Sequence, residues 1–195
     1  MFIIDFDDTL FDTQAFKQAR LGALKKLGVS EELYGQTYRA ARNKASGLFT
    51  YSSRRQAEAL SELGYDEAVM FAALEAINQP SELRKFVIEG AEVFLDTLKS
   101  LRHSMILLSL GDPNFQELKV KGTGLQIFFD RLFMIDTTKE NVLEVLFEHH
   151  DQSDVWFIND KVDETKKLFG QFTFLQPVLK VSLNINFSEY TNSGL

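Results

Sequence analysis

The pattern of apolar and polar positions divides the chain into a short strand, a long helical block and a region of alternating strands and helices. Residues 2–6 (FIIDF) form an apolar run that ends in an acidic cluster, which is typical of a buried strand in a parallel sheet. From about Thr13 to Glu82, apolar residues recur every three or four positions, which predicts helices. The predicted helices are a first one that ends at Gly28 and three more over residues 31–45, 53–63 and 66–77. Because no strand pattern interrupts this block, we expect an all-helical insertion after the first strand.

After Gly90 the chain alternates between strand and helix patterns. Short apolar runs predict strands over residues 104–110, 131–135, 155–159 and 172–176, with a weaker candidate over 181–187. Helical patterns cover residues 90–102, 113–120, 139–150 and 163–169. Repeated strand–helix units imply a parallel sheet with helices on both faces. We therefore predict an α/β fold: a Rossmann-like three-layer parallel-sheet core formed by residues 1–12 and 87–195, with residues 13–86 as a helical domain inserted after the first strand.

Composition narrows the classes of partner. The 195 residues carry a formal net charge of −7, which argues against binding to a nucleic-acid polymer or an anionic membrane, since both need a broad basic surface. The chain has no cysteine, so disulfides and thiolate chemistry are excluded. No apolar run approaches the roughly 20 residues of a transmembrane helix. The first apolar run meets a charge at Asp5, so we expect no signal peptide and a cytoplasmic location.

The acidic cluster after the first strand is the strongest candidate for chemistry. In a parallel α/β sheet, ligands bind outside the carboxyl ends of the strands, where this cluster falls. Asp5 and Asp7 are two residues apart, so on an extended chain both point into the same pocket. Two neighbouring carboxylates repel each other unless a cation neutralises them or one is protonated. A magnesium ion with a carboxylate nucleophile and a second, proton-donating acid would use both properties. The alternative is that the acids only cap the following helix.

The opening segment MFIIDFDDTLFDT resembles the first motif of the haloacid dehalogenase superfamily, a hydrophobic strand followed by DxD and often by a further xT or DTL. The resemblance implies that Asp5 is the nucleophile and Asp7 the acid/base. It also implies that the backbone carbonyl of Asp7, rather than its side chain, is a ligand of the metal. The dehalogenases that this chain resembles lack an acid two residues after the nucleophile, so Asp7 favours a phosphatase.

Two further motifs of that superfamily have counterparts in this chain. Ser109 ends the hydrophobic run 105–109, and the resemblance implies that its hydroxyl and the backbone of Leu110 and Gly111 bind the transferred phosphoryl group. Lys139 opens a predicted helix after the strand ending at 135, the expected place for a lysine that neutralises the nucleophile and the phosphoryl charge. Lys119 and Lys121, which are closer to Ser109 in the sequence, remain alternatives for that lysine.

The fourth motif completes the expected metal site. Asp160 follows the predicted strand 155–159 and is expected to bind Mg²⁺ together with Asp5 and Asp7. The superfamily commonly has Gly-Asp or Asp-Asp here, whereas this chain has Asn159 before the acid. A second acid follows as either Asp163 or Glu164, and the choice between them is open.

Together the motifs predict a magnesium-dependent phosphatase that hydrolyses small phosphate monoesters through an aspartyl-phosphate intermediate. The expected partner is a small phosphorylated metabolite, with no nucleic acid and no membrane. The alternatives are a phosphotransferase or phosphomutase of the same fold and a non-catalytic binding protein that retains the metal site. The sequence leaves open which metabolite is the substrate, and the oligomeric state. Inside the insertion, a stretch without acids carries five cations, and we hypothesise that part of it attracts an anionic substrate; the other interpretation is a solvated helix face. These cations are Arg39, Arg42, Lys44, Arg54 and Arg55.

Overall fold

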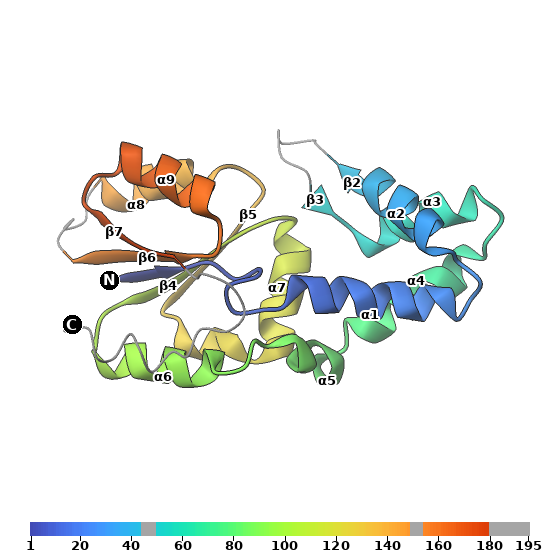
Figure 1. The fold of residues 1–195 in the computed structure, drawn as a ribbon, viewed down its shortest axis with the longest axis horizontal. Coiled ribbons are helices and arrows are strands. Elements are labelled where there is room, and N and C mark those ends of the chain that lie inside the picture. Colours follow the sequence, from blue (N-terminus) through green and yellow to red (C-terminus); the bar gives the residue numbers. More distant parts are fainter. Residues whose placement is uncertain (44–49, 149–153, 180–195) are drawn as a thin grey trace.

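The computed structural model describes residues 1–43, 50–148 and 154–179, and within them the core is a five-stranded parallel sheet (Figure 1). The strands lie in the order β5-β4-β1-β6-β7, so β1 is central and its neighbours β4 and β6 come from the distant second half of the chain. Their bounds are β1 Phe2–Ile4, β4 Met105–Leu110, β5 Arg131–Ile135, β6 Val155–Asn159 and β7 Leu175–Leu179. The predicted parallel sheet is confirmed, and the carboxyl ends of β1, β4 and β6 lie together at one edge.

Helices cover both faces of the sheet, because successive strand residues point to opposite sides. Ile4 on β1 packs in a cluster with helices α6 (Ala91–Ser100) and α7 (Pro113–Thr123). The preceding Ile3 packs on the other face, in a cluster with α8 (Lys139–Phe147) and α9 (Val162–Gln171). Figure 1 shows these two helix pairs on either side of the strands. The three-layer α/β arrangement predicted from the sequence is therefore confirmed.

The helices α1 to α4, which follow β1, form a packed unit beside the sheet (Figure 1). Apolar side chains of its helices build their own core, which includes Leu24, Leu60 and Leu74. The bounds are α1 Thr13–Lys25, α2 Glu31–Ala40, α3 Ser53–Ser61 and α4 Glu67–Ile77. The expectation of an all-helical insertion was wrong. Two-residue strands β2 (Arg42–Asn43) and β3 (Thr50–Tyr51) pair antiparallel, and strands this short have no alternating pattern that a sequence can reveal.

Two neighbouring segments connect this unit to the sheet. The Asp12 N–H donates to the C=O of Phe86 at 2.7 Å, and the Ile88 N–H donates to the C=O of Leu10 at 2.9 Å. Before the return segment, α5 (Pro80–Leu83) and the 3-10 helix η1 (Arg84–Phe86) lead back to the sheet, where Leu83 and Phe86 pack in the cluster that contains Ile4. The domain limits 1–12, 13–86 and 87–195 stay a prediction, because residues near the end of the insertion pack with the sheet.

Several element ends differ from the predicted ones. The helix expected over 31–45 ends at Ala40, where β2 begins shortly after. The strand expected over 172–176 is β7 at Leu175–Leu179, because the aromatic residues before it pack against α8 instead of joining the sheet. β7 contains Pro177 and, within the part of the chain that the structure describes, has a strand neighbour on one side only, the place where a sheet tolerates proline. The weaker strand candidate 181–187 lies outside the described residues. Within the described residues, no helix is long and apolar enough to cross a membrane.

Candidate active site

The chain forms a tight turn over residues 6–11 after β1, and two carboxylates, Asp5 and Asp7, lie at the carboxyl edge of the sheet where this turn begins. The Asp5 N–H donates to the C=O of Ile158 on β6 at 2.9 Å, so Asp5 continues the strand direction. The C=O of Phe6 then accepts hydrogen bonds from the N–H groups three, four and five residues further on. Asp8 adopts φ 59, a left-handed conformation that aspartate tolerates better than most residues. The turn therefore separates Asp5 from Asp7 while keeping both at the same edge of the sheet.

Lys139 lies between two carboxylates at the centre of the site. It is the first residue of α8, and its Nζ donates to Asp5 Oδ1 at 2.8 Å and to Glu164 Oε2 at 2.7 Å. The Lys139 and Asp5 side chains are 1% and 2% exposed. Burial would lower the pKa of Lys139, but the two carboxylates raise it above its ordinary value, so the side chain stays an ammonium. Burial raises the pKa of Asp5 above its ordinary value, despite the attraction of Lys139 and Lys161.

Two buried carboxylate oxygens at this ion pair lack a hydrogen-bond partner among the described residues. They are Asp5 Oδ2 and Asp160 Oδ1. Asp160 follows β6, and its N–H donates to Thr9 Oγ1 at 3.1 Å, which ties it to the turn after β1. Burial raises the pKa of the Asp160 carboxyl. A hard divalent cation bound to both oxygens would compensate their burial, and carboxylate oxygens are the ligands that Mg²⁺ prefers.

The donor set for such an ion is small. In ranges 1–43, 50–148 and 154–179, no group of three or more His, Asp or Glu side chains gathers to hold a metal. Mg²⁺ usually keeps several waters and binds through one or two protein carboxylates. Asp5 and Asp160 with the backbone carbonyl of Asp7, the set that the sequence resemblance implies, therefore fit magnesium without a third acidic side chain.

The structure distinguishes Asp163 from Glu164, the two acids that the sequence left as alternatives. Glu164 Oε2 accepts hydrogen bonds from Lys139 and, at 2.9 Å, from Nδ2 of Asn159. Burial would raise the pKa of Glu164, but Lys139 brings it below its ordinary value. Asp163 is exposed on the same helix. Glu164 is therefore the acid that contacts the site, and it does so by holding the lysine.

Asp7 is held by three side chains. Its Oδ1 accepts from Lys119 Nζ at 2.5 Å and from Thr13 Oγ1 at 3.0 Å, and its Oδ2 accepts from Gln116 Nε2 at 2.7 Å. Burial alone would raise the pKa of Asp7, but Lys119 together with the hydrogen bonds of Gln116 and Thr13 brings it below its ordinary value. The Asp7 side chain is 21% exposed, so it reaches solvent where the Asp5 carboxyl does not.

Ser109 lies at the end of β4 and belongs to the same hydrogen-bonded group. Its Oγ accepts from Gln116 Nε2 at 3.0 Å, and the C=O of Leu110 accepts from the same nitrogen at 2.8 Å. The side chain of Ser109 is fully buried. The Gly111 N–H donates to the C=O of Ile135 at 2.7 Å, so the neighbouring strand already engages this amide. Of the three predicted phosphate-binding positions, Ser109 and Leu110 are therefore connected to Asp7 through Gln116, whereas the amide of Gly111 bonds to β5.

Two lysines contact the two aspartates, and from the sequence both were candidates for the same role. Lys139 contacts Asp5, as predicted, whereas Lys119 contacts Asp7. Lys121 points elsewhere: its side chain is 61% exposed and pairs with Glu117. One sequence signal marked Lys119: with Gln116 it forms an i, i+3 pair of polar residues on the buried face of a helix that follows the Ser109 strand.

The basic stretch of the insertion is partly engaged in local structure. Arg54 pairs with Glu67 at 3.0 Å, and Arg55 donates to the C=O groups of Ala41 and Thr50, each at 2.7 Å. These two arginines thus hold the helices and the hairpin of the insertion together. Lys44 lies outside the described residues. The hypothesis of an anion-attracting surface therefore rests on the remaining part of the stretch and stays a prediction.

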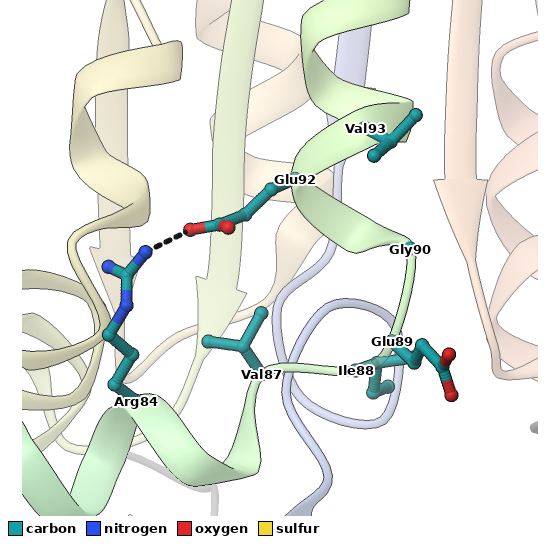
Figure 2. A pocket seen from close by; sticks show the side chains of 7 residues that line it. All are labelled: Arg84, Val87, Ile88, Glu89, Gly90, Glu92 and Val93. Carbon is teal, nitrogen blue, oxygen red and sulfur yellow. Dashed lines mark hydrogen bonds and ion pairs between the residues drawn. The ribbon is translucent and has the colours of Figure 1, made fainter.

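A pocket of about 270 Å³ lies away from these residues, beside the segment that returns from the insertion. Figure 2 shows it between η1 and the start of α6, with Val87, Glu89 and Val93 in its wall. Its two other charged groups, Arg84 and Glu92, already pair with each other at 2.7 Å. The pocket contains none of the predicted site residues.

Several solved structures have the same fold as this chain. A haloacid dehalogenase-like hydrolase of Burkholderia xenovorans LB400 aligns with a TM-score of 0.69 at 20% identity, covering 91% of this chain and 80% of its own. The HAD-hydrolase YfnB of Bacillus subtilis, whose magnesium-bound structure reveals interdomain movement, aligns with a TM-score of 0.57 at 18% identity, covering 95% of this chain and 89% of its own. The L-2-haloacid dehalogenase of Xanthobacter autotrophicus with covalently bound chloropropionic acid aligns with a TM-score of 0.57 at 18% identity, covering 93% of this chain and 78% of its own.

These likenesses establish the fold: the chain has the haloacid dehalogenase-like fold, as the resemblance of its first motif indicated. No protein-family model and no curated protein sequence matches it. The solved structures include both hydrolases of unstated substrate and a dehalogenase, so the chemistry of this chain has to be argued from its own residues.

Proposed function

We propose that this chain is a magnesium-dependent phosphohydrolase that forms an aspartyl-phosphate on Asp5. The observation that carries the proposal is the state of the Asp5 carboxylate. One oxygen is paired with the buried Lys139, and the other is buried without a partner among the described residues. A carboxylate held in this way has one oxygen fixed by an ammonium and the other available to a ligand, which are properties of a nucleophile that works beside a metal ion.

Both halves of the proposed reaction use Asp5 and Asp7. In the first half, an oxygen of Asp5 bonds to phosphorus as the bond from phosphorus to the leaving oxygen breaks, and Asp7 gives that oxygen a proton. In the second half, Asp7 takes a proton from water as the water oxygen bonds to phosphorus. The acyl-phosphate bond then breaks, which releases phosphate and restores Asp5.

Other side chains stabilise the charge that phosphoryl transfer concentrates on the non-bridging oxygens. Lys139 supplies a buried positive charge next to the nucleophile, and Ser109 supplies a hydroxyl at the neighbouring strand end. A magnesium ion bound by Asp5, Asp160 and the Asp7 carbonyl would supply further positive charge to the same oxygens.

Asp7 supports phosphoester hydrolysis over dehalogenation. A halide leaves as a stable anion and needs no proton, whereas an alkoxide does. Asp7 is partly exposed beside Asp5 at the sheet edge, which is where an acid that protonates the leaving oxygen has to lie. We further propose a small phosphorylated metabolite as the substrate, without nucleic acid or membrane as partners, and a cytoplasmic location. A phosphotransferase would use the same residues and differ in accepting an alcohol in place of water.

The proposed activity predicts phosphate release that depends on magnesium. Purified protein should release inorganic phosphate from p-nitrophenyl phosphate and from members of a panel of small phosphomonoesters with Mg²⁺, and lose this activity in EDTA. Chloride release from 2-chloropropionate serves as the competing reaction. Well-folded protein that releases chloride but no phosphate would replace the proposal by a dehalogenase. Protein that releases neither would favour a binding protein.

Metal binding is testable without turnover. We expect saturating Mg²⁺ to raise the midpoint of thermal unfolding by about 5–10 °C, because a ligand at about 100 times its Kd adds roughly 2.7 kcal/mol to stability. Asp160→Asn should abolish the shift, since it removes an unpartnered buried oxygen. Asp163→Asn is the matched control on the exposed side of the next helix and should keep it. Equal shifts in both variants would contradict the assigned ligand.

A further inference from the structure

The side chains around Asp7 form a group that the sequence motifs did not assign. Lys119 and Gln116 reach it from α7, and Thr13 reaches it from the first residue of α1. These residues come from segments more than a hundred positions apart, yet each directs a donor at the same carboxylate. Lys119 and Gln116 are almost fully buried, so their contacts with Asp7 are built into the packing of the helix against the sheet.

Lys119 has an environment that leaves its charge directed at Asp7. Its Nζ lies 5.5, 5.3 and 5.6 Å from the ring centroids of Phe6, Phe11 and Phe115. Aromatic rings at this range stabilise an ammonium without neutralising it. Among the described residues, Asp7 is the one carboxylate paired with Lys119. Burying a lysine against a single acid lowers stability when the desolvation of the two charges exceeds their attraction. We therefore expect this pair to have a role other than stabilising the fold.

Gln116 connects Asp7 to the strand that carries Ser109. The same Nε2 lies 2.7 Å from Asp7 Oδ2, 3.0 Å from Ser109 Oγ and 2.8 Å from the C=O of Leu110. This position depends on Gly111, because a Cβ there would lie 2.9 Å from that nitrogen. The amide therefore fixes the position of the Asp7 carboxylate relative to the end of β4.

The contacts also distinguish the two oxygens of Asp7. Oδ1 accepts from both Lys119 and Thr13, which fills the two lone-pair directions of a carboxylate oxygen. Oδ2 accepts from Gln116, the one donor to it among the described residues, and keeps one direction open. We infer that Lys119, Gln116 and Thr13 are positioning residues that orient the Asp7 carboxylate so that Oδ2 is its reacting oxygen. The inference rests on the proposed function, in which Asp7 exchanges a proton with the leaving oxygen and then with water.

The inference predicts a loss of rate that grows as the leaving group becomes poorer. A misplaced proton donor matters little for p-nitrophenolate, which departs without a proton, and matters most for an alkoxide. We expect Lys119→Met to lower kcat/KM for ethyl phosphate by about 100-fold, and for p-nitrophenyl phosphate by less than about tenfold. Phenyl phosphate should fall between them. Because kcat/KM covers steps up to loss of the leaving group, it isolates the half reaction in which the proton is donated.

Matched variants separate positioning from general disruption. Lys121→Met makes the same change two residues along the same helix, on an exposed side chain, and should leave kcat/KM for every substrate unchanged. Thr13→Val is a milder second variant, which removes one hydrogen bond without burying or removing a charge. It should give a smaller loss with the same dependence on the leaving group, and it keeps the inference testable if Lys119→Met does not fold.

A double-mutant cycle asks whether Lys119 acts through Asp7. In an Asp7→Asn background, Lys119→Met should change kcat/KM by less than roughly threefold, because the group that it positions is already absent. Equal losses for all leaving groups, or an undiminished loss in the Asp7→Asn background, would overturn the inference and leave the proposed function standing. Absence of any phosphate release by the wild type, or full activity of Asp5→Asn, would overturn the proposed function itself.

Discussion

Asp5→Asn should abolish phosphate release while leaving the protein folded. Asparagine has the shape of aspartate and keeps an oxygen that can accept the hydrogen bond from Lys139, which is 2.8 Å from Asp5 Oδ1. An amide is no nucleophile toward phosphorus, so turnover should fall by about 10³-fold or more, as when other covalent nucleophiles are removed. The midpoint of thermal unfolding without metal should stay within about 5 °C of wild type, since the change removes a buried carboxylate oxygen that lacks a partner.

The control for this result is Asp96→Asn, the same substitution on an exposed position of α6. It should leave both turnover and the unfolding midpoint unchanged. An Asp5→Asn protein that retains a tenth or more of wild-type turnover, with the same metal dependence, would show that Asp5 is not the nucleophile. A substrate with an isotopically labelled phosphoryl group should label the wild type covalently but not the Asp5→Asn variant. This result would independently support Asp5 as the nucleophile.

Lys139→Met should have the largest effect on stability among the site variants. Methionine matches the length of lysine but leaves Asp5 and Glu164 without the ammonium that lies 2.8 and 2.7 Å from their oxygens. Removing one partner of a buried ion pair costs about 3–5 kcal/mol. Because the Glu164 side chain is 23% exposed and regains some hydration, we expect the lower part of that range, a fall of about 5–15 °C in the unfolding midpoint. Activity should be lost as well, since the charge beside the nucleophile disappears.

Two further variants test the cause of this loss. Lys121→Met should unfold like the wild type, because Lys121 is exposed and exposed ion pairs contribute little. Adding Glu164→Gln to Lys139→Met should recover part of the lost stability, since it removes one of the two carboxylates left without the ammonium. A Lys139→Met protein as stable as wild type would mean that the buried pair does not support the fold.

The sequence predicted those parts of the fold whose pattern is local. The bounds of β5 and β6 agree with the strands expected over 131–135 and 155–159, and Lys139 begins a helix as expected. The five parallel strands with helices on both faces followed from the strand–helix alternation. In the candidate site, the resemblance to the superfamily implied a lysine beside Asp5, with Lys139 as the main candidate and Lys119 and Lys121 as alternatives, and Lys139 is the one that contacts Asp5.

Contacts set by side-chain packing across the sheet were not predictable in the same way. Gln116 and Lys119 reach Asp7 from α7, a helix more than a hundred residues further along the chain, and no local pattern encodes such a contact. The choice of Glu164 over Asp163 depends on one residue of rotation about α9. The hairpin of β2 and β3 is too short for its alternation to be read, and the start of β7 was misplaced because apolar aromatics precede it.

The insertion leaves the sheet and returns to it through segments bonded to each other by Asp12 to Phe86 and Leu10 to Ile88. The helical unit is therefore an insertion whose first and last residues lie next to each other at the edge of the core. Such an insertion can be exchanged, enlarged or shortened without changing the path of the chain through the core. The residues Asp5, Ser109, Lys139 and Asp160 all lie outside it. Thr13, the first residue beyond the junction, contacts Asp7, and Phe16 and Tyr51 of the helical unit contact Phe115 of α7. A transplant of this unit between proteins of the fold should therefore keep residues 1–13 with the recipient and change what reaches the site, leaving the reacting groups as they are.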